Sequence, residues 1–163
     1  MKQYQLNGNV LTLNVKKAPA FLRSVMFLFA FLFFIMPLAG MVLYMAIGNG
    51  FHIGFLFGMF FFGLMGFYLL RIALWNTYGN EVISITKNHI NYIADYGWFK
   101  DGKKQNEITA PIVYSIRQIG YEDDNTGGLV IGLEEPYIIC ATKMPIDELQ
   151  ELIAKLNNID NNK

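Results

Sequence analysis

Residues 69–85 read LLRIALWNTYGNEVISI, and the hydrophobic pattern of the chain changes within this stretch. The residues before it are almost continuously apolar, whereas apolar and polar residues alternate from Glu81 onward. A continuous apolar run of about 20 residues predicts a membrane-spanning helix, and alternation with a period of two predicts a half-buried strand. The stretch therefore marks the boundary between a membrane segment and a β-rich domain.

Two apolar runs precede this boundary, VMFLFAFLFFIMPLAGMVLYMAI at 25–47 and FHIGFLFGMFFFGLMGFYLL at 51–70. The residues between Arg23 and Arg71 include no Asp, Glu, Lys or Arg. The connector Gly48-Asn49-Gly50 is short and typical of a turn. We expect a helical hairpin with spans at about 24–47 and 51–75, because a cleaved signal peptide would be shorter and would not be followed by a second span. Uncharged spans also disfavour a pump or transporter.

The charges divide between the two halves of the 163-residue chain. All 13 acidic residues lie after residue 80. Residues 1–80 carry only basic charges, at Lys2, Lys16, Lys17, Arg23 and Arg71. The positive-inside rule then places both termini in the cytoplasm, and we expect a multi-pass protein of a bacterial inner membrane.

Interface anchors and helix-packing residues can be assigned within this hairpin. We expect Arg23, Arg71, Trp75 and Tyr78 to lie at the membrane interface, because cations and amphipathic aromatic rings are favoured there. Small residues let helices approach closely. The second span offers such residues for packing on the first span, or for a dimer face or a partner's groove, at Gly54, Gly58, Gly63 and Gly66.

The remainder predicts a cytoplasmic α+β domain. An apolar stripe after Pro145 predicts an amphipathic helix at 145–157, followed by a polar tail at 159–163. Residues 1–20 predict a β-hairpin with a turn at Asn7-Gly8, which we expect to dock on the domain and extend its sheet. The domain boundaries expected are 1–20, 21–76, 79–158 and 159–163. The predicted strands are at 81–86, 90–98, 104–109, 112–122, 129–135 and 137–142.

Two spans, about six strands and one closing helix resemble the bacterial PH-like membrane proteins. The local match is the junction at 69–85, in which Trp75 and the step Gly79-Asn80-Glu81 lead from the membrane into the first strand. The resemblance covers about residues 20–158, mostly as architecture. It implies a bent sheet or barrel of about six or seven strands closed by the C-terminal helix, and it implies no enzyme.

The residue types needed for common cofactor and metal sites are missing or wrongly spaced. The acidic run at 122–124 lacks the spacing of a calcium loop, and two histidines with one cysteine, Cys140, cannot form a typical zinc site. No phosphate-binding glycine motif precedes a helix, and the acidic balance of the domain disfavours nucleic acid. We expect no metal, no cofactor, no small-molecule substrate and no catalytic residue.

One stretch carries a candidate surface, WFKDGKK at 98–104. It contains two aromatic residues and three lysines, namely Trp98, Phe99, Lys100, Lys103 and Lys104. These residues form either a loop at the level of anionic lipid headgroups or an ordinary hairpin end with its turn at Asp101-Gly102. In the second case Trp98 shares the side of the strand occupied by Tyr92 and belongs to the core.

The leading function is a non-catalytic, membrane-tethered interaction module that holds a protein partner, or another copy of itself, at the cytoplasmic face. One alternative is a module that senses anionic lipid through residues 98–104. Another is an accessory subunit of a membrane enzyme or transporter.

Overall fold

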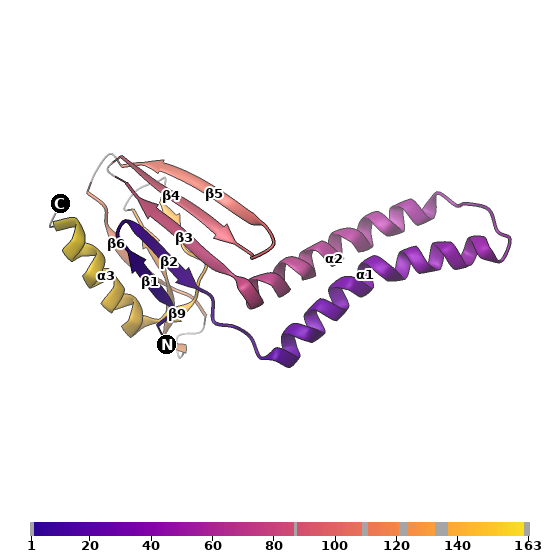
Figure 1. Ribbon diagram of the computed structural model, residues 1–163, viewed down its shortest axis with the longest axis horizontal. Coiled ribbons are helices and arrows are strands. Elements are labelled where there is room, and N and C mark those ends of the chain that lie inside the picture. The colour runs from indigo at the N-terminus through magenta and orange to yellow at the C-terminus, as the bar shows by residue number, and fades with distance from the viewer. Residues whose placement is uncertain (1, 87, 109–110, 121–123, 133–136, 162–163) are drawn as a thin grey trace. The chain divides into compact units, whose positions relative to one another are not determined.

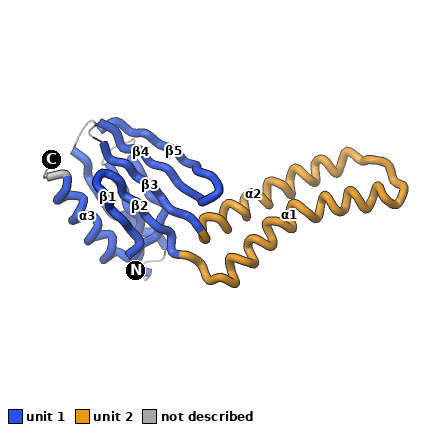
Figure 2. Tube along the Cα trace, in the orientation of Figure 1, with its two compact units in different colours: residues 1–16, 78–163 blue, residues 17–77 orange. Residues whose placement is uncertain are grey.

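The computed structural model describes residues 2–86, 88–108, 111–120, 124–132 and 137–161 (Figure 1). The chain divides into two units (Figure 2). The first, which we call the β unit, joins Met1–Lys16 to Tyr78–Lys163, and the second is Lys17–Thr77. The second unit is therefore inserted into the sequence of the first.

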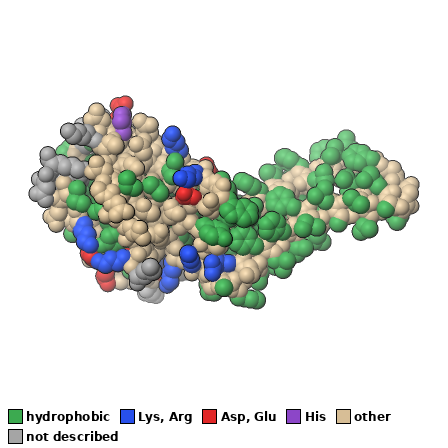
Figure 3. Space-filling model, in the orientation of Figure 1, with side chains coloured by type: hydrophobic (Ala, Val, Ile, Leu, Met, Phe, Trp, Pro, Cys, Tyr) green, Lys and Arg blue, Asp and Glu red, His purple; other side chains and the backbone are tan. Residues whose placement is uncertain are grey.

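The inserted unit is a pair of long apolar helices, α1 (Ala20–Ala46) and α2 (Gly54–Tyr78). Their mean hydropathy is 2.5 and 1.8 over the most apolar window, and only 6% of each window is buried. A helix of 27 residues is about 40 Å long, which exceeds the hydrocarbon thickness of about 30 Å. Hydrophobic side chains are spread along both helices (Figure 3). Both helices are long and apolar enough to span a membrane, as the sequence predicted.

The glycines of α2 fall into two groups. A Cβ at Gly66 would lie 2.9 Å from the Phe34 ring and 3.1 Å from the Ala30 carbonyl oxygen, so α1 approaches α2 closely at this position. An added Cβ at Gly58 or Gly63 would meet no atom within 4 Å. At Gly54 it would meet only the His52 ring. Of the four predicted packing glycines, only Gly66 therefore packs against α1.

The β unit contains a five-stranded antiparallel sheet with the strand order β1-β2-β3-β4-β5. Its side chains alternate between buried and more exposed positions along β3 and β4, as a period of two requires. The strands are β1 (Tyr4–Asn7), β2 (Val10–Asn14), β3 (Asn80–Ile85), β4 (His89–Asp95) and β5 (Lys100–Glu107).

The N-terminal hairpin extends this sheet, because β2 pairs with β3 from Val10↔Ser84 to Asn14↔Asn80. The turn lies one residue later than predicted. Asn7 pairs with Val10, so the two loop residues are Gly8 and Asn9, and Gly8 has φ +58°. The inserted helices thus occupy the connection between two adjacent antiparallel strands.

A second sheet pairs β6 (Tyr114–Gln118) with β7 (Thr126–Ile131), and β7 with both β8 (Ile138–Ile139) and β9 (Met144–Pro145). Helix α3 (Ile146–Asn161) follows β9 directly and buries Leu149, Leu152 and Leu156. Within the described part of the predicted strand at 112–122, residues 114–118 pair with β7, and residues 121 and 122 lie outside the described residues. The predicted strand at 137–142 pairs only through Ile138 and Ile139.

The α+β class and the C-terminal helix are confirmed, but the strand arrangement differs from the expectation. Within the described residues the strands form two sheets, neither of which closes into a barrel. The buried side chains of both sheets and of α3 form the core, including Leu11, Ile83, Leu129 and Leu149.

Candidate interaction surface on the β4–β5 hairpin

The β4–β5 turn lies at residues 96–99 rather than at Asp101-Gly102. The Tyr96 N–H donates to the Phe99 carbonyl oxygen at 2.9 Å, which closes the turn. Gly97 supplies the left-handed conformation, with φ +84°, and its N–H donates to Asp95 Oδ1 at 2.8 Å. A carboxylate that binds the backbone two residues on is an Asx turn, which fixes the start of the loop. We call residues 96–99 the aromatic tip.

The three aromatic residues of the aromatic tip lie in different environments. Tyr96 is buried, and Phe99 stacks on it with ring centroids 4.8 Å apart and an interplanar angle of 14°. Trp98 is 62% exposed. The alternation of side chains along the strand predicted a core position for Trp98. Because β4 ends at Asp95, that alternation does not extend to Trp98. The aromatic tip therefore places one large indole ring at the surface.

Gly102 lies in a β-bulge with Lys103 instead of in a turn with Asp101. Tyr92 pairs with Lys104 and Ala94 pairs with Asp101, so Gly102 and Lys103 together lie opposite Ile93. Gly102 has φ +65°, as the first residue of a glycine bulge requires. The bulge shifts the alternation of the strand between Lys103 and Asp101.

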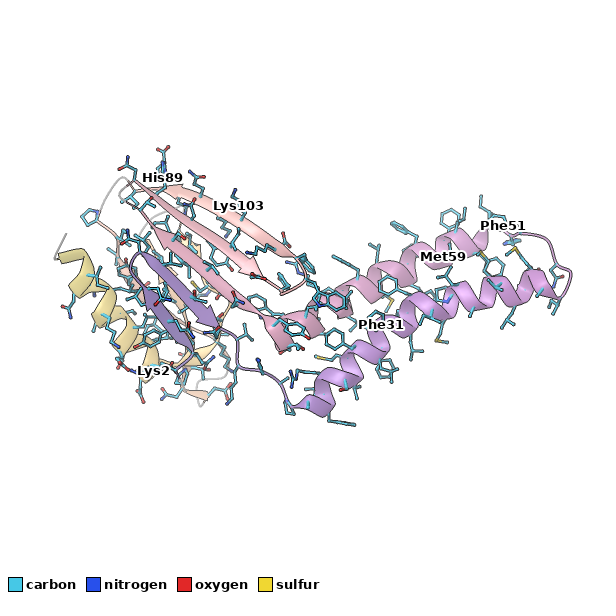
Figure 4. The ribbon with its side chains drawn as sticks, in the orientation of Figure 1. Lys2, Phe31, Phe51, Met59, His89 and Lys103 are labelled. Atoms are coloured by element: carbon cyan, nitrogen blue, oxygen red, sulfur yellow. The ribbon has the colours of Figure 1, made fainter. Side chains whose placement is uncertain are left out.

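All three lysines of the candidate stretch are exposed. Lys100 lies opposite Asp95, with its Nζ 3.4 Å from Asp95 Oδ2. Lys104 shares the sheet face of its partner Tyr92, and the adjacent Lys103 is labelled on β5 in Figure 4. The lysines therefore form a basic strand edge that begins directly after the aromatic tip.

Strand β5 is an outer strand of the five-stranded sheet and is exposed along most of its length. The Ile108 N–H donates to the Asn88 carbonyl oxygen at 2.9 Å, which identifies a hydrogen-bonded pair in the antiparallel ladder. Such pairs alternate along the strand, so the next one is Asn106 with Ile90. The backbone groups of Gln105 and Glu107 therefore point away from β4, toward the open edge.

The predicted interface anchors lie near the ends of the two apolar helices. Arg23 is in the first turn of α1, and Arg71 and Trp75 are in the last two turns of α2. These three are half-buried, whereas Tyr78, the last residue of α2, is 51% exposed. Tyr78 also belongs to the β unit, where a Cβ at Gly97 would lie 2.7 Å from its Cβ. The structure thus brings Tyr78 against the aromatic tip.

Sequence reasoning gave no role to Glu81, which is completely buried. Its Oε1 accepts hydrogen bonds from the Tyr92 hydroxyl at 2.5 Å and the Ala141 N–H at 2.7 Å. Its Oε2 accepts one from the Thr142 N–H at 2.8 Å. Tyr92 lies on the first sheet, whereas residues 141 and 142 connect β8 to β9 in the second. Glu81 therefore ties the two sheets together. The available signal was parity, since Glu81 lies on the same strand face as the buried Ile83 and Ile85.

The Tyr92 hydroxyl and the Cys140 thiol, which both feel the Glu81 carboxylate, are held in their protonated forms. Burial, reinforced by the negative charge of Glu81, raises the pKa of Tyr92 well above its ordinary value. Burial, and then the same carboxylate, also raises the pKa of the buried Cys140 thiol. Both groups therefore stay protonated at neutral pH, and a protonated buried thiol is a poor nucleophile.

Other sequence candidates have ordinary surroundings or lie outside the described residues. Among the residues that the structure describes, no group of three His, Cys, Asp or Glu side chains is placed to hold a metal ion. His52 accepts a hydrogen bond from the Gly54 N–H at 3.1 Å, which caps the start of α2. Residues 122 and 123 of the acidic run lie outside the described residues.

Comparison with known proteins gives no match to a family model, a curated protein or a solved structure.

Proposed function

We propose that this chain is a non-catalytic, multi-pass protein of a bacterial inner membrane whose PH-like β unit holds a protein partner, or another copy of itself, at the cytoplasmic face. The pairing of β2 with β3 supports a common side for both termini, since the segments before α1 and after α2 fold together. The basic residues Lys16, Lys17 and Arg23 before and within the first helical turn support a cytoplasmic side. Two antiparallel sheets with one C-terminal helix support the PH-like assignment.

The observation that carries the interaction role is the open edge of β5. Its outward backbone groups at Gln105 and Glu107 are arranged to pair with an added strand, and side chains on both faces are exposed. An extended segment that adds to a sheet edge gains main-chain hydrogen bonds, and neighbouring side chains set its specificity. The exposed lysines at 103 and 104 favour a partner segment that carries acidic residues.

The test uses the full-length protein in its native membrane, with a photo-crosslinking amino acid in place of Gln105. We expect one discrete adduct, whose mass distinguishes a partner from a second copy. Glu107→Pro removes an outward N–H without removing a bond to β4, so it should abolish the adduct. Glu107→Ala is the matched control for the lost charge and should retain the adduct. The same crosslinker at the exposed Gln150 on α3 should give no adduct of that mass.

Two results would refute the interaction role. The first is the absence of an adduct at Gln105 in cells that express the protein at its native level. The second is an adduct that persists unchanged in the Glu107→Pro chain, because that contact would not depend on strand addition.

A further inference from the structure

The aromatic tip lies at the end of the five-stranded sheet where the second apolar helix ends. Asn80 at the start of β3 pairs with Asp95 at the end of β4, and the tip follows directly. The close approach of Gly97 to Tyr78 places the tip against the last residue of α2. These residues all belong to the β unit, so this proximity is a property of that unit by itself.

Two amphipathic aromatic rings are exposed at this end of the sheet. Trp98 is 62% exposed and Tyr78 is 51% exposed, whereas Tyr96 in the same turn is 8% exposed. The tip therefore has a stacked aromatic pair that supports it, buried Tyr96 and half-buried Phe99, and an indole ring that projects from it. Trp and Tyr rings are enriched where membrane meets water, because one part of each ring is apolar and another forms hydrogen bonds.

The charges near the tip are mainly positive. Lys100, Lys103 and Lys104 follow it on β5 and are exposed. Lys16 is exposed at the same end of the sheet, since the N–H of the preceding Val15 donates to the Gly79 carbonyl oxygen at 3.1 Å. Two acids lie among these lysines: Asp95 accepts the Gly97 N–H and lies 3.4 Å from Lys100, and Asp101 on β5 accepts the Gly102 N–H. Basic residues next to a span are attracted to the anionic cytoplasmic leaflet.

We propose that the aromatic tip binds the anionic headgroup layer of the bilayer that contains α1 and α2. Trp98 lies at the level of the headgroups, and the lysines of β5 contact lipid phosphates. Binding at this surface orients the β unit on the membrane and leaves the far end of its sheet in the cytoplasm. This site rests on the membrane placement proposed above but not on the protein-partner role.

The test uses three full-length proteins, each with one tryptophan, in lipid nanodiscs. The first is Trp75→Phe, which leaves Trp98. The others carry Trp75→Phe and Trp98→Phe with either Phe61→Trp or Val10→Trp. Phe61 is 62% exposed in the first third of α2, near the middle of the apolar run at 51–70, and reports insertion into the bilayer. Val10 is the distal control. It pairs with Ser84 at the end of the sheet that is far from Tyr78.

The discs contain either phosphatidylcholine or an equal mixture of phosphatidylcholine and phosphatidylglycerol. In each disc, lipid brominated near the headgroup is used for Trp98 and Val10→Trp, and lipid brominated at mid-chain is used for Phe61→Trp. We expect brominated lipid to quench Trp98 much more strongly in the anionic discs. Added salt should remove that excess because it screens the lysines. Phe61→Trp should be quenched in both discs and Val10→Trp in neither. Lys100→Gln/Lys103→Gln/Lys104→Gln should abolish the excess seen for Trp98 in anionic discs.

The outcomes separate this inference from the proposed function. If Trp98 is unquenched in both discs while Phe61→Trp is quenched, the tip does not contact lipid and only this inference fails. If Phe61→Trp is also unquenched, the membrane placement fails as well. If inorganic phosphate added to the phosphatidylcholine discs shifts Trp98 emission as anionic lipid does, the site binds a free anion and the bilayer-surface proposal is overturned.

Discussion

The two ends of the five-stranded sheet carry turns of opposite chemistry. The end near Tyr78 has the aromatic tip, Tyr96-Gly97-Trp98-Phe99. The far end has the Gly8-Asn9 turn and the connection from Thr86 to His89, in which the Thr86 N–H donates to the His89 carbonyl oxygen at 2.9 Å. Figure 4 labels His89 at that far end.

The two turns share their backbone geometry and differ in what packs against them, which accounts for their different side chains. Both two-residue turns use a glycine in the left-handed region, with φ +58° at Gly8 and +84° at Gly97. An added Cβ at Gly8 would meet nothing within 4 Å, whereas at Gly97 it would lie 2.7 Å from Tyr78. The far turn needs only polar residues that water can solvate. The near turn is packed against the residue that ends α2, which favours aromatic side chains there.

The largest expected effect comes from removing the Glu81 carboxylate, whose hydrogen bonds join the two sheets. Glu81→Ala leaves the Tyr92 hydroxyl and the N–H groups of Ala141 and Thr142 without their acceptor. We expect a loss of about 3–5 kcal/mol in the free energy of unfolding, since buried donors would lose their partner and a cavity would form. Urea unfolding in detergent, followed by Trp98 fluorescence in a Trp75→Phe background, measures it.

The matched controls separate the shared acceptor from each donor. Tyr92→Phe removes one of the three donors and should cost about 1 kcal/mol. Thr86→Ala at the far end removes an exposed hydrogen bond to the His89 carbonyl oxygen and should cost less. A Glu81→Ala chain as stable as Thr86→Ala would show that Glu81 does not hold the sheets together.

The two turn glycines test the comparison directly. Gly97→Ala forces a left-handed alanine and brings its Cβ against Tyr78, so we expect a loss of about 2–3 kcal/mol. Gly8→Ala suffers only the conformational cost, about 1 kcal/mol. The same urea unfolding measures both. Equal losses would contradict the packing of the aromatic tip against Tyr78, and Gly97→Ala/Tyr78→Gly, which also removes the Tyr78 Cβ, should recover part of the larger loss.

Elements that depend on local pattern were predictable from the sequence. The two apolar helices follow from uncharged runs, β3 and β4 from alternation, and α3 from its apolar stripe. The two turn positions were wrong for a common reason. Asn7-Gly8 and Asp101-Gly102 are favoured turn dipeptides, but pairing of the neighbouring strands decides which residues enter the loop. Asn7 pairs with Val10, and Asp101 pairs with Ala94.

The candidate surface was predictable in composition but not in geometry. Residues 98–104 were identified from their aromatic and basic side chains, yet the exposure of Trp98 depends on where β4 ends. The contact between Gly97 of the aromatic tip and Tyr78 joins residues 19 positions apart, and no local pattern encodes it. Glu81 shows the same limit, because parity indicates a buried carboxylate but cannot name its partners on the β8–β9 connection.

The smallest expected effect concerns the hairpin with the polar turn, which charged contacts help hold to α3. Hydrogen bonds from Lys2 and then Lys155 lower the pKa of the exposed Glu151 to about 2, from an ordinary value of 4.5. A lowered pKa stabilises the fold above pH 4.5, and this contribution is lost as the pH falls toward about 2. Glu151→Gln should therefore melt slightly below the unsubstituted protein near neutral pH, by less than Gly8→Ala does. The melting temperatures of Glu151→Gln and the unsubstituted protein should become equal once the pH is below about 2. Salt should narrow the neutral-pH difference, because exposed ion pairs are screened. A difference that persists unchanged at the acidic end would show that Glu151 acts through packing on Tyr4 or Lys155 rather than through its charge.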